Sequence, residues 1–256
     1  MSLQRPIVSA VLAAGLTLSL VACGGGSKTT GSSSPSTTAS ATPTPTPTAS
    51  STTPTVAQTT PTAPKARTKA ELTKALLALS DLPTGLSVDN SGDEEDGSGL
   101  SSKDSRCADV VKLFNAKTVP GSTATATRSF TGGQDGPFID EDLDAMPSAT
   151  AATALVNRAQ AAIRSCRQVT LKITGVGSSP AKISEVSAPK VGSTRFGVRF
   201  SATSGPLEGL EINFVIAALG DVVLGMSFDD PNQIQGAVTA AVGKANKVLG
   251  TPKAGA

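Results

Sequence analysis

The chain has 256 residues, of which 38% are hydrophobic, 3% aromatic and 16% charged, and its formal net charge is +2. Histidine, tryptophan and tyrosine are absent, which excludes Ser-His-Asp and Cys-His catalysis and any metal site built on imidazole. The missing Trp and Tyr and the near-neutral charge also argue against nucleic acid as a partner.

The first 22 residues have the pattern of an export signal. Arg5 and the amino terminus carry positive charge, and residues 7–21 are mostly apolar. As a helix this run would be about 22 Å long, too short for a hydrocarbon core of about 30 Å, so it predicts a signal peptide. The sequence LVAC at 20–23, followed by three glycines, resembles the lipobox of bacterial lipoproteins.

That resemblance implies that Cys23 receives a diacylglyceryl group and becomes the mature amino terminus. Two buried acyl chains suffice for stable anchoring, so we expect a lipid-anchored protein on the extracytoplasmic side of the cell membrane. The alternative is an ordinary secretory signal in which Cys23 occurs by chance.

A Thr/Ser/Pro-rich segment follows the predicted signal. Residues 27–64 contain 14 Thr, 8 Ser and 7 Pro, and such a composition cannot bury enough apolar area to offset the entropy of ordering. The pattern predicts a signal peptide over 1–22, the lipidated cysteine and a disordered linker over 23–67, one extracytoplasmic domain over 68–250 and a tail over 251–256.

Helices dominate the first half of the predicted domain. Thr68 and Glu71 form a capping-box pattern at the start of a helix that ends near Pro83. The expected elements after it are a loop over 87–104, a short helix over 107–114, a strand over 122–131, an acidic loop over 140–144 and a long helix over 148–166.

Alternating apolar residues then predict strands at 169–173, 196–200, 210–216 and 222–228, with a hairpin turn at Gly220-Asp221. Asp230 and Pro231 open a final helix that Gly250 closes. Gly236 and Gly243 in that helix suggest a close approach to the sheet. The fold class is therefore α+β, an antiparallel meander sheet packed against two to three helices.

Two cysteines remain once Cys23 is set aside. Cys107 and Cys166 lie on two predicted helices, and export permits a disulfide, which would contribute roughly 4 kcal/mol by closing a loop of about 60 residues. Buried free thiols are the alternative. The absence of C-x-x-C spacing disfavours redox chemistry.

Charge is unevenly distributed between the halves of the domain. Residues 81–144 carry 13 acids and 5 bases, whereas residues 145–256 carry 6 acids and 11 bases. Lys172, Arg195 and Arg199 are candidates for an anion-binding patch that faces a headgroup or a wall polymer, although ordinary solvent-facing charge is the simpler explanation. The acidic runs at 93–96 and 140–144 do not fit the EF-hand spacing, so we expect no metal.

One family resemblance covers about 180 residues. The segment LVNRAQAAIRSC at 155–166, a helix that ends in cysteine, is followed by strands and a closing helix. With the earlier segment from Ala70 to Pro83, it resembles the sensor domain of bacterial serine/threonine kinases of the PknH type. The resemblance implies a cleft-bearing domain for an unidentified extracellular ligand and brings no catalytic residues.

Two functions follow. The first is a non-catalytic ligand-binding or sensor-like domain that faces the cell wall and binds an extracellular ligand, a cell-wall component or a partner protein. The second is a carrier of lipids or apolar small molecules, with its cavity between the helix over 148–166 and the sheet. No nucleotide-binding or nucleophile-elbow motif occurs in the predicted domain, so we expect no cofactor and no enzymatic activity.

Overall fold

The computed structural model describes residues 66–90, 98–133 and 136–251. The predicted signal peptide, Cys23, the linker up to residue 65, the acidic run at 93–96 and the tail from 252 lie outside these ranges. Within them, no helix is long and apolar enough to cross a membrane. The elements are α1 Lys69–Ala75, β1 Ser87–Asp89, β2 Gly99–Ser101, α2 Ala108–Phe114, β3 Ala124–Thr131, β4 Phe138–Ala145, α3 Ala149–Ser165, β5 Gln168–Ile173, β6 Gly177–Val186, β7 Thr194–Ala202, β8 Glu211–Leu219, β9 Val222–Phe228 and α4 Ile234–Leu249, with short 3-10 turns between some of them.

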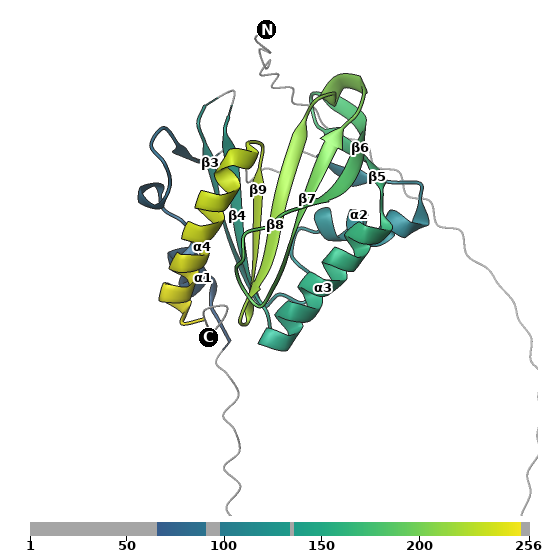
Figure 1. Ribbon diagram of the computed structural model, residues 1–256. Helices are drawn as coiled ribbons and strands as arrows, with labels where there is room; N and C mark the ends of the chain where they lie inside the picture. The colour runs from purple at the N-terminus through teal and green to yellow at the C-terminus, as the bar shows by residue number, and fades with distance from the viewer. Residues whose placement is uncertain (1–65, 91–97, 134–135, 252–256) are drawn as a thin grey trace, which may run out of the picture. The chain divides into compact units, whose positions relative to one another are not determined.

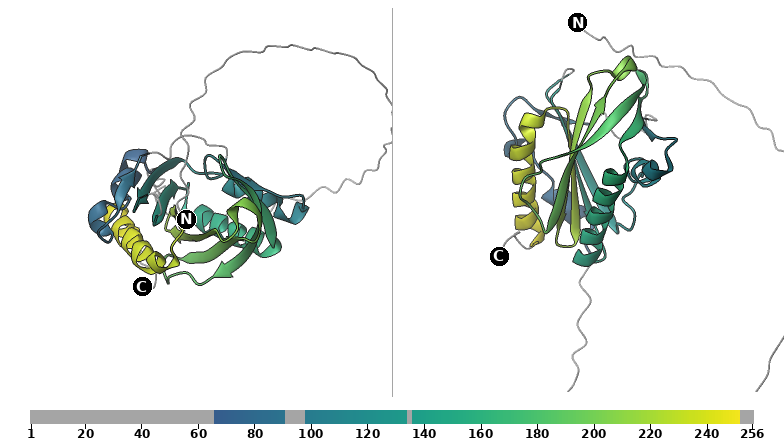
Figure 2. Two further views of the ribbon diagram at one scale, coloured as in Figure 1. Left: turned by 90° about the horizontal axis from the view of Figure 1, so that it is seen from above. Right: turned by 45° about the vertical axis from the view of Figure 1, so that its right-hand side comes forward.

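The strands form one antiparallel sheet in the order β1-β3-β4-β9-β8-β7-β6-β5-β2. Strands β5 to β9 run as a consecutive meander, and β4 joins this meander by pairing with β9 (Figure 1). The sheet is curved, with α3 inside the curve and α4 outside it (Figure 2, left). The α+β class and the meander predicted from the sequence are confirmed.

Each helix layer covers only half of the sheet. Helices α1 and α4 pack on the outer face of β3, β4, β9 and β8, whereas α3 packs on the inner face of β6 to β9. Large buried side chains of the two clusters include Leu72, Phe130, Leu143, Leu224, Met226 and Phe228 in the first, and Val156, Ile163, Phe196, Val198 and Phe200 in the second. The other half of each face therefore has no helix among the described residues.

The acidic run at 140–144 was expected in a loop, and that expectation is wrong. It forms most of β4, which lies inside the sheet between β3 and β9. Ile139 and Leu143 point into the core as in any amphipathic strand, but Glu141 lies between them on the same face and hides the alternation. The ten-residue strand β6 has no counterpart among the sequence predictions, and the predicted loop over 87–104 contains the short strands β1 and β2.

The Cys107–Cys166 disulfide is present. Cys107 is buried at the start of α2 and Cys166 directly follows α3, so the bond holds the two helices together at one end. Arg67, the last residue of the predicted linker, forms a two-pronged ion pair with Asp221 and donates to the Leu249 carbonyl. The chain is thus fastened to the domain from Arg67 onward.

The expectation for the glycines of α4 is also wrong. A Cβ atom placed on Gly236 or Gly243 would meet nothing within 4 Å, so neither residue permits a close approach to the sheet. Glycine in a helix interior then only adds conformational freedom to the unfolded chain.

We therefore expect Gly236→Ala and Gly243→Ala each to raise the free energy of unfolding by about 1 kcal/mol. Urea denaturation of the single and double variants measures this. Gly250→Ala is the matched control, because Gly250 ends α4 with a positive φ of 64° and alanine there should destabilise the protein. Destabilisation by Gly236→Ala would contradict this account.

Candidate functional site

Three aspartates alternate along β4, and all of them lie on the inner face of the sheet, beyond the half that α3 covers. The strand register aligns each of them with residues of the neighbouring strands on the same face. The rows are Ser129–Asp140–Ser227–Phe214, Thr127–Asp142–Gly225–Ile216 and Thr125–Asp144–Val223–Ala218. One wall of this face is therefore acidic and hydroxylated, and two strands away the face becomes apolar.

The aspartates have different partners. Asp140 accepts a hydrogen bond from Ser227 at 2.7 Å, and Asp144 accepts one from Thr125 at 2.6 Å. Asp142 has no hydrogen-bonding partner among the described residues, and its row neighbour is Gly225, whose hypothetical Cβ would lie 3.8 Å from the Asp142 Cβ. The glycine leaves the Asp142 carboxyl uncovered on the β9 side.

Burial and mutual repulsion act on these carboxyls. Burial, followed by the charges of Asp144 and Asp140, raises the pKa of Asp142 to about 7. Burial also raises the pKa of Asp144, although the hydrogen bond from Thr125 opposes the shift. Near neutral pH, Asp142 therefore carries a proton about half of the time, and a nearby positive charge would remove it.

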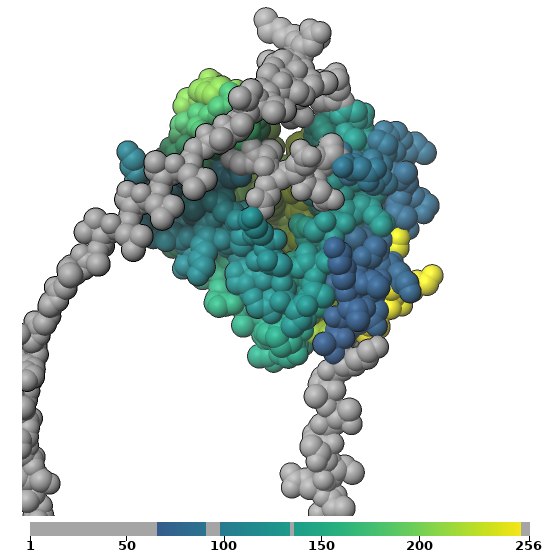
Figure 3. Space-filling view, turned by 180° about the vertical axis from the view of Figure 1, so that it is seen from behind, coloured from purple at the N-terminus to yellow at the C-terminus, as the bar shows by residue number. Residues whose placement is uncertain are grey.

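A hollow opens on this side of the molecule (Figure 3). It lies between the β3–β4 side and the α2 side, and the yellow-green surface of the late strands is visible in its floor. Phe114 at the end of α2 contacts Phe200 and Phe214 edge to face, with ring centroids 5.1 Å apart in both pairs. These contacts form an aromatic wall that begins at Phe214, two strands away from Asp140 on the same face.

The helix that carries Phe114, α2, is fixed to its neighbours at both ends. The Asn115 side chain accepts from the Leu100 amide at 2.8 Å and donates to the Leu100 carbonyl at 2.7 Å. This pair of hydrogen bonds joins the end of α2 to the edge strand β2. The disulfide fixes the other end of α2, so the wall is preorganised.

Glu141 lies on the opposite face of β4, and its side chain has a structural role. It is fully buried, one carboxylate oxygen accepts from the Leu77 amide at 2.7 Å, and the other has no partner among the described residues. Arg128 donates to the Leu77 carbonyl. The sheet thus holds both backbone groups of Leu77, two residues after α1, and burial raises the pKa of Glu141 to about 7.

The raised pKa values predict that the domain becomes more stable as the pH falls from about 8 to about 5.5. A group whose folded-state pKa exceeds its unfolded value stabilises the fold when protonated, and this contribution is lost as pH rises through the folded pKa. We expect the free energy of unfolding to fall by about 2 kcal/mol for Glu141 alone between about pH 5.5 and about pH 8. Below about pH 4 the trend reverses, because Asp81, Asp104 and Glu185 have lowered pKa values that favour their charged forms.

Glu141→Gln should remove much of this slope, since the amide oxygen still accepts from the Leu77 amide and carries no charge. Chemical denaturation at several pH values measures it. Glu185→Gln is the control, because Glu185 is exposed, and it should leave the slope between about pH 5.5 and about pH 8 intact. An unchanged slope in Glu141→Gln would refute the assignment.

The three predicted basic residues lie on the outer face of the sheet but do not form one cluster. Arg199 on β7 bonds Asn213 and pairs with Glu211 at 3.2 Å. Arg195 lies four residues before Arg199 on β7, on the same face. Lys172 of β5 pairs with Ser178 of β6, whereas Arg199 pairs with Ser184 of the same strand. These two β6 residues are six positions apart, so Lys172 lies roughly 20 Å from Arg199 along the strands. Anion binding by this set stays a prediction.

The curved antiparallel sheet, with α3 on its inner face and α1 and α4 on its outer face, defines an α+β domain. Residues 67–246 match the family described as PknH-like extracellular domain, and the chain belongs to that family. Its fold is similar to the extracellular domain of PknH from Mycobacterium tuberculosis, with a TM-score of 0.50 and 16% identity over 73% of this chain and 98% of that chain. The resemblance inferred from the sequence is confirmed. No curated protein matches.

Proposed function

We propose that this protein is a lipid-anchored extracytoplasmic lipoprotein whose non-catalytic, sensor-like domain binds a cationic ligand with an apolar body in the hollow. The observation that carries the proposal is the row Asp142–Gly225–Ile216. It offers a carboxyl, then an open glycine, then an apolar surface about 10 Å from the carboxyl.

The chemistry of the row selects the ligand. An ammonium group placed over Gly225 would meet Asp142 without competition from a protein donor, since no described residue bonds that carboxyl. The body of the ligand would extend toward Ile216 and the Phe114–Phe214 wall, where apolar contact is favourable. A neutral or anionic ligand would gain nothing from the three aspartates.

The packing under α3 favours this binding function over the carrier. Leu155, Val156 and Ile163 of α3 are buried against Phe196 and Val198 of the sheet in one continuous cluster. The space that a carrier would need between this helix and the strands is therefore filled by side chains.

Phenethylamine is a suitable probe, with 2-phenylethanol as its neutral analogue. We expect isothermal titration calorimetry of the full-length chain to show binding of the amine only, with release of protons near pH 7, because the cation displaces the proton of Asp142. Asp142→Asn should weaken binding about tenfold.

Asp109→Asn, which changes an exposed carboxyl on α2, is the matched control and should bind the amine normally. Equal affinity for the alcohol, or unchanged binding by Asp142→Asn, would refute the proposed ligand class. The same calorimetry in buffers of different ionisation enthalpy counts the protons released.

The lipid anchor has its own test. We expect Cys23→Ser to leave the protein in the soluble fraction of a lipoprotein-processing bacterial host, whereas the unmodified sequence sediments with membranes as residues 23–256 carrying a lipid mass. Ser32→Ala in the linker is the control. Sedimentation of Cys23→Ser with the membranes would contradict the anchor.

A further inference from the structure

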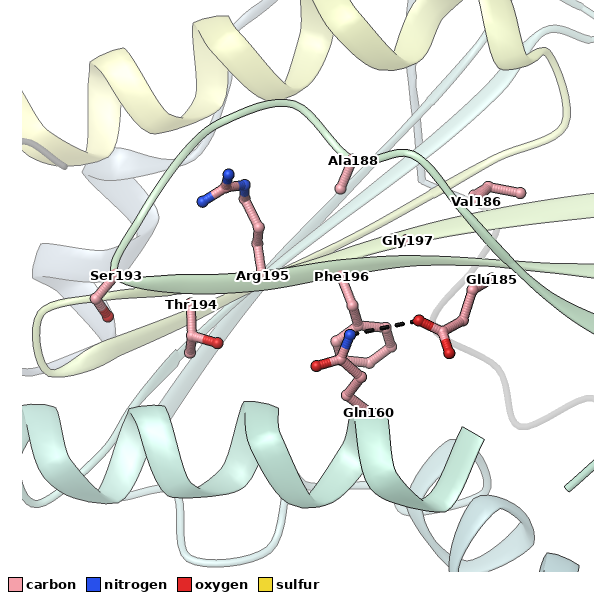
Figure 4. A pocket seen from close by; sticks show the side chains of 9 residues that line it. All are labelled: Gln160, Glu185, Val186, Ala188, Ser193, Thr194, Arg195, Phe196 and Gly197. Atoms are coloured by element: carbon pink, nitrogen blue, oxygen red, sulfur yellow. Dashed lines mark hydrogen bonds between the residues drawn. The ribbon is translucent and has the colours of Figure 1, made fainter. Parts of the chain in front are cut away.

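Strand β6 leaves the sheet before its neighbour β7 begins. The β6–β7 ladder starts at the pair Val186–Gly197, so residues 194–196 of β7 have no partner on that side. The chain from 187 to 193 instead crosses the outer face, where Ala188 and Val191 pack into the cluster under α4. A slot of about 380 Å³ lies where β6 would have continued (Figure 4).

The slot presents an unpaired backbone residue. Successive residues of a strand direct their backbone groups to opposite sides. Ala202 donates to the Leu210 carbonyl and accepts from the Gly209 amide, both just before β8, whereas the Thr203 amide donates to the Pro180 carbonyl of β6. The register has no break between 194 and 201, so Arg195, like Thr203, directs its amide and carbonyl toward the β6 side. Neither group has a hydrogen-bonding partner among the described residues.

The Arg195 side chain adds an uncompensated positive charge at the same place. It is half-buried and forms neither an ion pair nor a side-chain hydrogen bond with any described residue. Figure 4 shows it on the side of the crossing chain, leaning toward Ser193, with Gln160 of α3 on the other side of β7. A buried or half-buried charge without a partner is costly, which an anion in the slot would relieve.

The slot is preformed. A Cβ on Gly197 would come within 2.8 Å of the Val186 carbonyl, and one on Gly192, whose φ is +64°, within 2.4 Å of the Ala218 carbonyl. Both glycines therefore let the crossing chain lie directly on the strands. Since its apolar residues are buried, the chain holds the slot open without a ligand.

From these observations we propose that the slot binds a short peptide with a free carboxyl terminus. One peptide residue exchanges two hydrogen bonds with the backbone of Arg195, as the next residue of β6 would have done. A ligand that runs in the direction of β6 places its carboxyl end toward Ser193, where the guanidinium leans. Glu185 lines the opposite end of the slot, which disfavours a ligand with several negative charges.

The dipeptide alanylalanine is the probe, and its carboxyl-terminal amide is the comparison ligand. In titrations of the full-length chain we expect the amide to bind about tenfold more weakly than the acid, and Arg195→Gln to weaken binding of the acid by a similar factor. Lys182→Gln removes an exposed cation outside the slot and should leave binding unchanged. Equal binding of acid and amide, unchanged binding by Arg195→Gln, or no binding of the dipeptide would overturn the proposal.

Amide hydrogen exchange followed by NMR provides a second readout that needs no variant. The Arg195 amide should exchange rapidly in the free protein and become protected at saturating dipeptide. The Gly197 amide, which lies in the ladder with Val186, should be protected in both states. Rapid exchange at Arg195 with bound dipeptide would refute the backbone pairing.

Discussion

The ladder between β4 and β9 is the contact on which the rest of the domain depends. Its register runs from Ile139–Phe228 to Ala145–Val222, and it is the place where the amino-terminal strands join the carboxy-terminal meander. The helices on its two sides pack on opposite faces of the sheet. Among the described residues, half of each face therefore has no helix packed on it, and the inner bare half carries the three aspartates of β4.

This ladder also carries two neighbouring carboxyls that a central strand rarely tolerates. Glu141 and Asp142 point to opposite faces, and burial raises both pKa values to about 7. The Glu141 side chain is used structurally, since it binds the Leu77 amide. Asp142 is half-buried on the inner face and has no comparable partner among the described residues. Of the two, only Asp142 is available to a ligand.

Local signals in the sequence were sufficient for elements whose pattern is regular. The long helix predicted over 148–166 is confirmed as α3, and the cysteine count predicted the disulfide. Strand β4 was missed because Glu141 interrupts its apolar alternation, and what makes that position tolerable is a hydrogen bond to Leu77, 64 residues away. The hollow depends on the register of four strands, and no local pattern encodes such a register.

The two proposed binding regions share one row of the sheet. Asp142, Gly225 and Ile216 continue on the same face to Phe196 of β7, and Phe196 lines the slot. From Asp142 to Ile216 each strand of this row is paired on both sides, whereas β7 at Phe196 has lost its β6 partner. The slot therefore lies at the β7 end of this row, where the β6–β7 ladder stops, and the hollow lies at its β4 end. Because the edge of β7 is unpaired at the slot, an extended chain can pair with it there. If β6 continued past Val186, it would form hydrogen bonds with the backbone amide and carbonyl of Arg195 and fill the slot.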